Sequence, residues 1–160
     1  MRTTLALLTV ALLLPVLLAG CDSQPTARVA TSAAVPQEAT LQAGDTTIRA
    51  SVVQTSALNE QVASQYGIER DDEVVMLLVG LRRGQAAEET SVPATVNATV
   101  TDLRGQKQVI GMRELHAGSL VDYVGTVRVS LPDTLAFDLR IEREGAPAST
   151  MQFSREFLPQ

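Results

Sequence analysis

The side chains that most often carry enzyme chemistry are scarce in this chain, which has one histidine, His116, and one cysteine, Cys21. Zinc sites need three or four nitrogen or sulfur ligands, so these two residues do not form one. The sequence has no Gly-x-Ser-x-Gly elbow, glycine-rich phosphate loop or dinucleotide fingerprint. His116 precedes Ala117-Gly118, where a hairpin turn is expected, so a solvated side chain is the simplest interpretation. We therefore expect no catalytic residues, no cofactor and no metal, in a protein that is not an enzyme.

An acidic cluster lies just before the middle of the chain, where Arg70 stands among Glu69, Asp71, Asp72 and Glu73. Oxygen-rich loops suit Ca²⁺, so the cluster is a possible weak calcium site. Its spacing is not that of an EF-hand, and no glycine stands at the required turn. The pattern favours a solvated loop, and calcium binding stays an alternative.

Two charged dipeptides, Arg113-Glu114 and Asp122-Tyr123, fall on neighbouring predicted strands. Opposite charges across a hairpin stabilise it by roughly 0.2 to 1 kcal/mol, which would make these residues structural. The alternative is a recognition patch, and Arg113, Glu114, Asp122 and Tyr123 are therefore the candidate interaction residues.

The formal net charge of −5 argues against nucleic-acid binding, which calls for clustered lysine and arginine. Stacking platforms for bases or sugars also need exposed aromatic rings. The chain has three Phe, two Tyr and no Trp, which barely supply a core. We expect no nucleic-acid partner.

Cys21 lies where an apolar N-terminal run stops, in the context Leu18-Ala19-Gly20-Cys21. This resembles a bacterial lipobox, in which small side chains admit the peptidase and only a thiol can form the thioether to diacylglycerol. Lipidation also accounts for a lone cysteine, which in an exported protein would otherwise be a reactive thiol. Each buried CH₂ contributes about 0.8 kcal/mol, so several acyl chains, palmitate among them, anchor firmly. Membrane lipid is thus the first predicted partner, through Cys21.

The segments around Cys21 are expected to lie outside the folded domain. Residues 1–20, with Arg2 before an apolar stretch, have the layout of a cleaved signal peptide. Residues 21–45 are rich in Ser, Thr, Pro and Ala and predict a lipidated flexible tether. This places the protein on the periplasmic side of a bacterial membrane, and Asp22 after the cysteine favours the inner membrane.

Beyond the tether, apolar and polar residues alternate with a period of two, which is typical of half-buried strands. Residues 74–79 are apolar on both faces and predict a strand covered on both sides. The expected strands are residues 46–52, 74–79, 92–100, 109–115, 120–130, 135–141 and 151–157.

One helix is expected over residues 57–66, with Ser56 as its N-cap and Gly67 followed by Ile68 as a Schellman-type stop. Seven strands and one short helix in residues 46–160 predict an all-β domain, a seven-stranded immunoglobulin-like sandwich without a disulfide. A smaller open barrel is the alternative.

Several short segments resemble an uncharacterised proteobacterial family, domain of unknown function 4426, in their order and spacing over about residues 46–158. They are Tyr66-Gly67-Ile68-Glu69-Arg70, Val92-Pro93-Ala94-Thr95-Val96, Asp102-Leu103-Arg104-Gly105-Gln106, Met112-Arg113-Glu114 and Asp122-Tyr123-Val124. The resemblance implies a small exported domain without an assigned activity, and it supplies no catalytic residues.

Taken together, the sequence predicts a membrane-anchored periplasmic lipoprotein that is a non-catalytic protein-interaction or assembly module of the cell envelope, with an envelope protein as partner. A tethered sandwich offers its faces and edge strands to such a partner. The alternative is a periplasmic module that binds a small ligand or calcium.

Overall fold

The computed structural model describes residues 37–85 and 88–160. The predicted signal peptide, Cys21, Asp22 and most of the predicted tether lie outside the described residues. In the described ranges, no helix is long and apolar enough to cross a membrane.

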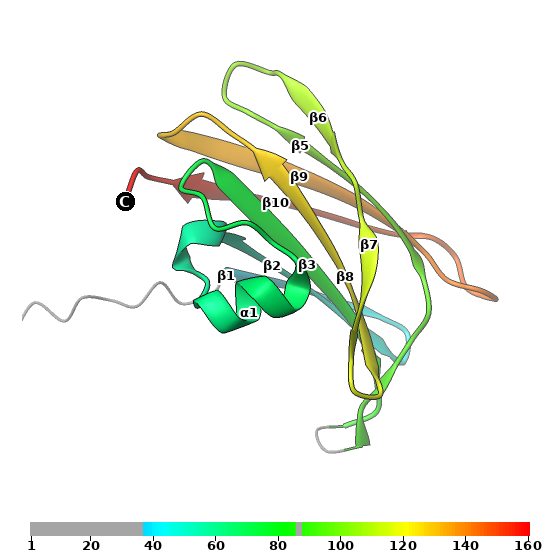
Figure 1. The fold of residues 1–160 in the computed structure, drawn as a ribbon. Helices are drawn as coiled ribbons and strands as arrows, with labels where there is room; N and C mark the ends of the chain where they lie inside the picture. The colour runs from blue at the N-terminus through cyan, green and yellow to red at the C-terminus, as the bar shows by residue number, and fades with distance from the viewer. Residues whose placement is uncertain (1–36, 86–87) are drawn as a thin grey trace, which may run out of the picture. The chain divides into compact units, whose positions relative to one another are not determined.

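The described chain forms two antiparallel sheets, which confirms a mostly β fold with one α-helix (Figure 1). The larger sheet, sheet A, has the order β1-β2-β3-β8-β7, and β4 pairs with β3. Its strands are β1 (Gln37–Ala43), β2 (Thr46–Gln54), β3 (Val74–Arg83), β4 (Thr90–Ser91), β7 (Arg113–Ala117) and β8 (Leu120–Arg128). Sheet B has the order β10-β9-β5-β6, from β5 (Thr95–Thr101), β6 (Lys107–Ile110), β9 (Asp133–Glu142) and β10 (Ser149–Phe157).

The part of the chain that the structure describes has ten strands, which exceed the seven of the predicted immunoglobulin-like sandwich for three local reasons. The predicted strand at 109–115 is divided at Gly111 into β6 and β7, where the chain passes from sheet B to sheet A. The two-residue strand β4 is too short for a periodic signal.

The third added strand, β1, lies in the predicted tether and pairs with β2 along its whole length. The predicted start of the domain at residue 46 is therefore too late. Ala39, Leu41 and Ala43 of β1 are only partly buried against the core, and two of the three are small alanines, so the alternation in the sequence is weak.

The main core fills the space between the sheets with aliphatic side chains from both. Phe137 of β9 is its largest fully buried side chain and stacks on Phe153 of β10, with ring centroids 5.2 Å apart. Burial of such side chains contributes about 1.5–3 kcal/mol each and is the main source of stability.

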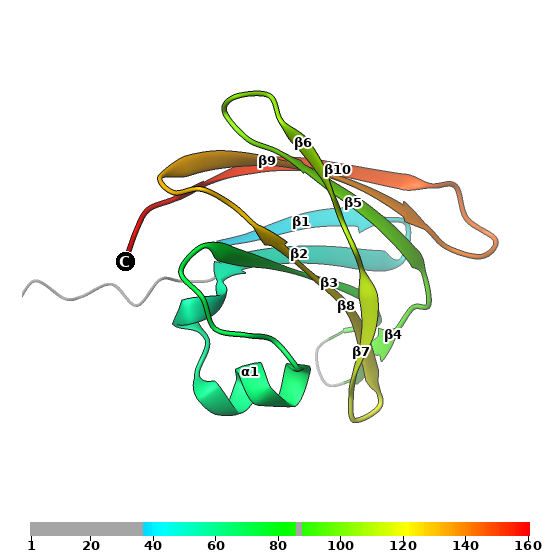
Figure 2. The ribbon, with the colours of Figure 1, turned by 45° about the horizontal axis from the view of Figure 1, so that its top comes forward.

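A second, smaller cluster lies on the outer face of sheet A, beneath helix α1 (Glu60–Tyr66) and the 3₁₀ turn η1 (Thr55–Ala57) (Figure 2). Its buried members are Met76, Leu115 and Val124. The apolar side chains on both faces of β3 are thus covered, as its sequence predicts.

Helix α1 begins later than predicted, because Ser56 lies in η1 and Asn59 is the N-cap. The Asn59 side chain accepts a hydrogen bond of 2.8 Å from the Val62 amide. The predicted end is confirmed: Gly67 has φ 62°, and the Ile68 amide donates to the Ala63 carbonyl at 2.8 Å.

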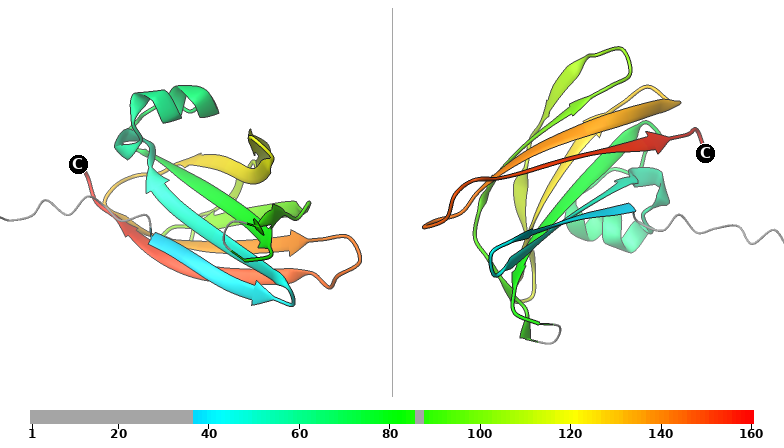
Figure 3. Two further views of the ribbon diagram at one scale, coloured as in Figure 1. Left: turned by 90° about the horizontal axis from the view of Figure 1, so that it is seen from below. Right: turned by 180° about the vertical axis from the view of Figure 1, so that it is seen from behind.

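Side chains and a tight crossing join the two sheets. Strands β1 and β10 lie side by side (Figure 3), and the Arg143 guanidinium donates to the Ala43 carbonyl and the Ser149 hydroxyl. At the opposite seam the turn between β6 and β7 crosses Gly125 of β8. A Cβ there would lie 2.6 Å from Ile110 Cγ2 and 2.8 Å from the Gly111 carbonyl oxygen, so only glycine fits.

Candidate functional site

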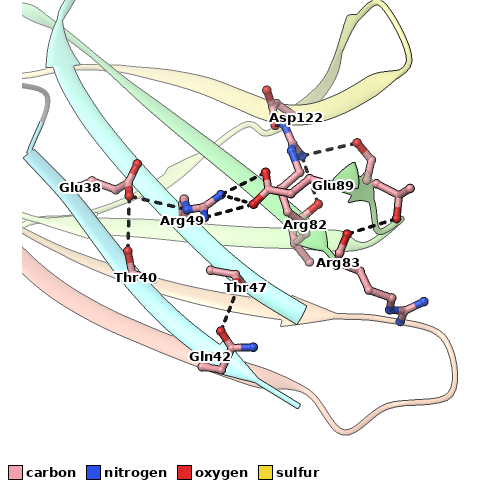
Figure 4. A network of polar contacts seen from close by, with 12 residues as sticks. Glu38, Thr40, Gln42, Thr47, Arg49, Arg82, Arg83, Glu89 and Asp122 are labelled. Carbon is pink, nitrogen blue, oxygen red and sulfur yellow. Dashed lines mark hydrogen bonds and ion pairs between the residues drawn. The ribbon is translucent and has the colours of Figure 1, made fainter. Parts of the chain in front are cut away.

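A hollow of about 160 Å³, lined mainly by polar and charged residues, lies on the part of the outer face of sheet A beside the helix-covered cluster. Figure 4 shows the network of polar contacts around it. The register of β2, β3 and β8 places Arg49 beside Gly80 and Gly80 beside Asp122. Gly80 leaves the space between the two charged side chains, since a Cβ there would lie 2.9 Å from Asp122 Oδ1.

The floor of the hollow is the ion pair between Arg82 of β3 and Asp122 of β8. The two side chains are only 10% and 17% exposed. Arg82 Nη1 also donates to the Leu81 and Val121 carbonyls, at 3.1 Å each. A guanidinium taken out of water needs such partners, so the floor is a closed network that holds the fold.

The same network positions the segment that leaves sheet A for sheet B. The Val121 amide donates to Ser91 Oγ at 2.7 Å, which fixes β4 against β8. The rim of the hollow is thereby built from a fixed backbone.

The rim carries Arg49, whose side chain is 39% exposed. Its guanidinium lies 3.3 Å from a Glu89 carboxylate oxygen and 3.9 Å from one of Glu38. Two carboxylates from different segments restrict the rotamers of Arg49, so it presents a charged group in a fixed orientation at the surface. Such a group can recognise a polar partner, because little side-chain entropy remains to be lost on binding.

The predicted pairing of β7 with β8 is confirmed, but the four candidate interaction residues do not form one patch. The register pairs Arg113 with Val124 and Glu114 with Tyr123, so their side chains alternate between the two faces of sheet A. Asp122 belongs to the floor described above.

Tyr123 is buried in the main core, where its hydroxyl accepts a hydrogen bond of 2.7 Å from the Ala94 amide. Glu114 lies at the exposed edge, 3.3 Å from the His116 imidazole. His116 is solvent-exposed in β7, close to the predicted turn at Ala117-Gly118.

Arg113 lines a different hollow, a cleft of about 220 Å³ between the end of α1 and β8. Its guanidinium donates to the Tyr66 carbonyl at the C-terminal end of the helix, where a cation is favourable. Glu69, in the loop after α1, lines the same cleft.

Two carboxylates of the acidic cluster, Asp71 and Glu73, pair with one arginine of β8. Arg128 lies 2.6 Å from Asp71 and 3.2 Å from Glu73. The hydrogen bond from Arg128 and a second from the Glu73 amide hold the pKa of Asp71 below its usual value. In residues 37–85 and 88–160, no group of three His, Cys, Asp or Glu side chains is arranged to hold a metal ion.

Sequence reasoning missed Arg49, Arg82, Glu38 and Glu89, because their proximity depends on strand register and on the path of the β3–β4 connection. One local signal was present for Arg82. It follows a buried apolar run two residues after Gly80, and an arginine in that position needs a partner on a neighbouring strand.

Comparison with known proteins finds related domains, but none among curated proteins. Residues 40–160 match the family model described as "Domain of unknown function (DUF4426)". A crystal structure of a DUF4426 family protein from Pseudomonas aeruginosa PAO1 is 25% identical, with a TM-score of 0.65 over 77% of this chain and 96% of that one.

Two structures of FetP from uropathogenic Escherichia coli strain F11 have the same fold at lower identity. A copper-bound variant is 12% identical, with a TM-score of 0.55 over 78% of this chain and 97% of that one. A second structure, of FetP recombinantly expressed in the periplasm, is 10% identical, with a TM-score of 0.53 over 79% and 97%. At this identity the likeness concerns the fold.

Proposed function

We propose that this chain, which belongs to the DUF4426 family, is a membrane-anchored periplasmic lipoprotein and a non-catalytic protein-interaction or assembly module of the cell envelope. The observation that supports this most is Arg49, held by Glu38 and Glu89 on an uncovered strip of sheet A. Interfaces are enriched in arginine, and a preorganised arginine loses little entropy on binding.

The chemistry of the hollow fits recognition better than catalysis. Arg82 and Asp122 are committed to each other and to backbone carbonyls, so the floor has no nucleophile beside a free base. The rim combines one cation with two carboxylates, which suits a polar protein surface with both kinds of charge.

Site-specific photocrosslinking in intact cells tests this proposal. A photoreactive amino acid at Thr40, which neighbours Arg49 across β1 and β2, should give a discrete adduct with an envelope protein. The matched position is exposed Asn97 in β5, on the outer face of sheet B. The adduct should form from Thr40 and be absent from Asn97.

The variant Arg49→Gln should reduce the Thr40 adduct, whereas Arg140→Gln on sheet B should leave it unchanged. An adduct of equal yield from both positions, or one insensitive to Arg49→Gln, would contradict the assignment of this face.

The anchor is a separate part of the proposal and rests on Leu18-Ala19-Gly20-Cys21. Mass spectrometry of the membrane fraction should find diacylglyceryl-modified Cys21 as the mature N-terminus. The Cys21→Ser variant should lose membrane association. A soluble periplasmic form with a free Cys21 thiol would refute the anchor, and membrane fractionation would test the inner-membrane preference drawn from Asp22.

The second candidate, a periplasmic module for a small ligand or ion, is favoured by the copper-bound FetP variant of the same fold. Ions that bind only the folded state raise the melting temperature. The melting temperature of the full chain should be measured as Cu²⁺ or Ca²⁺ is added. Because Arg128 already pairs with Asp71 and Glu73, we expect Ca²⁺ to give no increase.

A further inference from the structure

The cleft that Arg113 and Glu69 share is independent of the Arg49 face, and it has features of a small-molecule site. It is lined by residues from three separate segments: Gly67, Ile68, Glu69 and Val74 after the helix, Gly111 and Arg113 around the β6–β7 turn, and Val124, Gly125 and Thr126 of β8. Strand β7 first pairs with β8 at Arg113, opposite Val124, so the cleft lies over the edge of β8 that β7 leaves free.

The two charged side chains of the cleft have opposite signs but do not form an ion pair with each other. Among the ion pairs of the described residues, neither Glu69 nor Arg113 takes part. Elsewhere on the molecule Arg49, Arg82, Arg83, Arg128 and Arg140 each meet a carboxylate. Arg104 also lines a hollow with Asp102 and Asp133 without an ion pair, so the separation leaves both charges of this cleft available but is not peculiar to it.

Arg113 is positioned to receive a carboxylate. The Tyr66 carbonyl accepts from one terminal nitrogen of its guanidinium, which fixes the side chain against the helix end. A guanidinium has five N–H donors in a planar fork that matches the two oxygens of a carboxylate. Glu69 can accept hydrogen bonds from an ammonium group.

The size and the walls of the cleft narrow the ligand class. A volume of about 220 Å³ lies below the roughly 300–1,000 Å³ of sites for drug-sized ligands, so the ligand is small. Half-buried Ile68 and Val74 contribute apolar surface to the cleft beside the two charged residues. We propose that this cleft binds a small zwitterion, an α-amino acid with an aliphatic side chain, with its carboxylate on Arg113 and its ammonium on Glu69.

The test uses the ¹⁵N-labelled full chain and three probes that share the same branched four-carbon unit. L-Valine has both charges, isovalerate lacks the ammonium and isobutylamine lacks the carboxylate. L-Valine should shift the amide resonances of Gly67, Glu69 and Thr126. Isovalerate and isobutylamine should bind at least about tenfold more weakly, because each loses one charge-assisted hydrogen-bonded contact.

Two variants and their matched controls assign the roles. Arg113→Gln should weaken L-valine binding by about tenfold or more, and Glu69→Gln should abolish the preference for L-valine over isovalerate. The exposed turn residues Arg104 and Glu144 provide the controls, as Arg104→Gln and Glu144→Gln, which should bind as the unmodified chain does.

The peptide Gly-Gly-Val separates a free amino acid from a peptide C-terminus, since its ammonium cannot lie next to its carboxylate. Weaker binding than L-valine supports the zwitterion. Equal binding, no shift at the three amides with L-valine, or unchanged binding in Arg113→Gln would overturn the proposal. None of these results depends on whether a protein binds at Arg49.

Discussion

Two pairs of opposite charges lie on the side of sheet A that carries helix α1, and they have different partners. Arg82 and Asp122 meet each other beneath the Arg49 rim, and both are largely withdrawn from water. Arg113 and Glu69 line one cleft beside the helix and stay exposed and apart. The residue types are similar, but the first pair is committed to the fold and the second is available to a ligand.

The difference follows from what each arginine already binds. Arg82 donates to two backbone carbonyls as well as to Asp122, so its loss would leave a half-buried carboxylate without its charged partner. The hydrogen bond from Arg113 goes to the last turn of a helix, whose carbonyl can turn to water instead. Burial and backbone partners therefore distinguish a structural charge from an available one.

The largest expected effect is the loss of stability in Arg82→Gln. Removing one partner of a buried ion pair costs about 3–5 kcal/mol, and the partial exposure of Asp122 reduces this to about 2–4 kcal/mol. Arg113→Gln should cost less than about 0.5 kcal/mol, as is usual for an exposed side chain. Urea unfolding of both variants measures the two losses of stability. Equal losses would contradict the distinction between a structural and an available arginine.

A smaller effect is expected from Gly125→Ala, which tests the wall shared by the cleft and the β6–β7 crossing. A Cβ would meet Ile110 Cγ2 at 2.6 Å and the Gly111 carbonyl oxygen at 2.8 Å, so the crossing must move. We expect a loss of about 1–3 kcal/mol in urea unfolding. Gly111→Ala, where a Cβ meets open space, is the matched control.

Unchanged stability in Gly125→Ala would show that the β6–β7 turn does not cross β8 as closely as described. The cleft would then have a different wall, and its volume would not limit the ligand.

The smallest effect concerns pH, at a third group of opposite charges, in which Arg128 of β8 meets Asp71 and Glu73. The pKa of Asp71 is lowered from 3.8 by hydrogen bonding to Arg128. A lowered pKa in the folded state means that this charge stabilises the protein above pH 3.8, and that the contribution is lost as pH falls through the lowered pKa. Asp71→Asn should therefore lose less stability on acidification than the unmodified chain, as measured by urea unfolding across this range. An identical acid dependence in the two proteins would show that the Asp71–Arg128 pair is not coupled to folding.

The alternation of apolar and polar residues predicts most of the fold, because successive side chains of a half-buried strand point in turn to the core and to solvent. It failed at β1, whose inward residues Ala39 and Ala43 are small, and at Gly111, where one predicted strand changes sheet. The helix end was predicted from Gly67, whereas its start was misplaced because Ser56 and Asn59 are both good caps.

The candidate site was predicted less well, since it depends on contacts between distant strands. Arg113 and Asp122 were recognised as charges on neighbouring strands, but their separate environments required the register and the position of α1. Tyr123 looked like a surface residue from its dipeptide with Asp122, whereas it is in the core. The Arg49 rim arises from β1, β2 and the segment before β4, which no local pattern connects.

A double-mutant cycle tests the distinction between the two pairs most directly. Urea unfolding of Arg82→Gln, Asp122→Asn and the double variant should give a coupling free energy of about 1 kcal/mol or more, because the partners interact. The same cycle for Arg113→Gln and Glu69→Gln, without ligand, should give less than about 0.3 kcal/mol. A coupling between Arg113 and Glu69 as large as that between Arg82 and Asp122 would contradict the account, because the cleft charges would then be partners of each other.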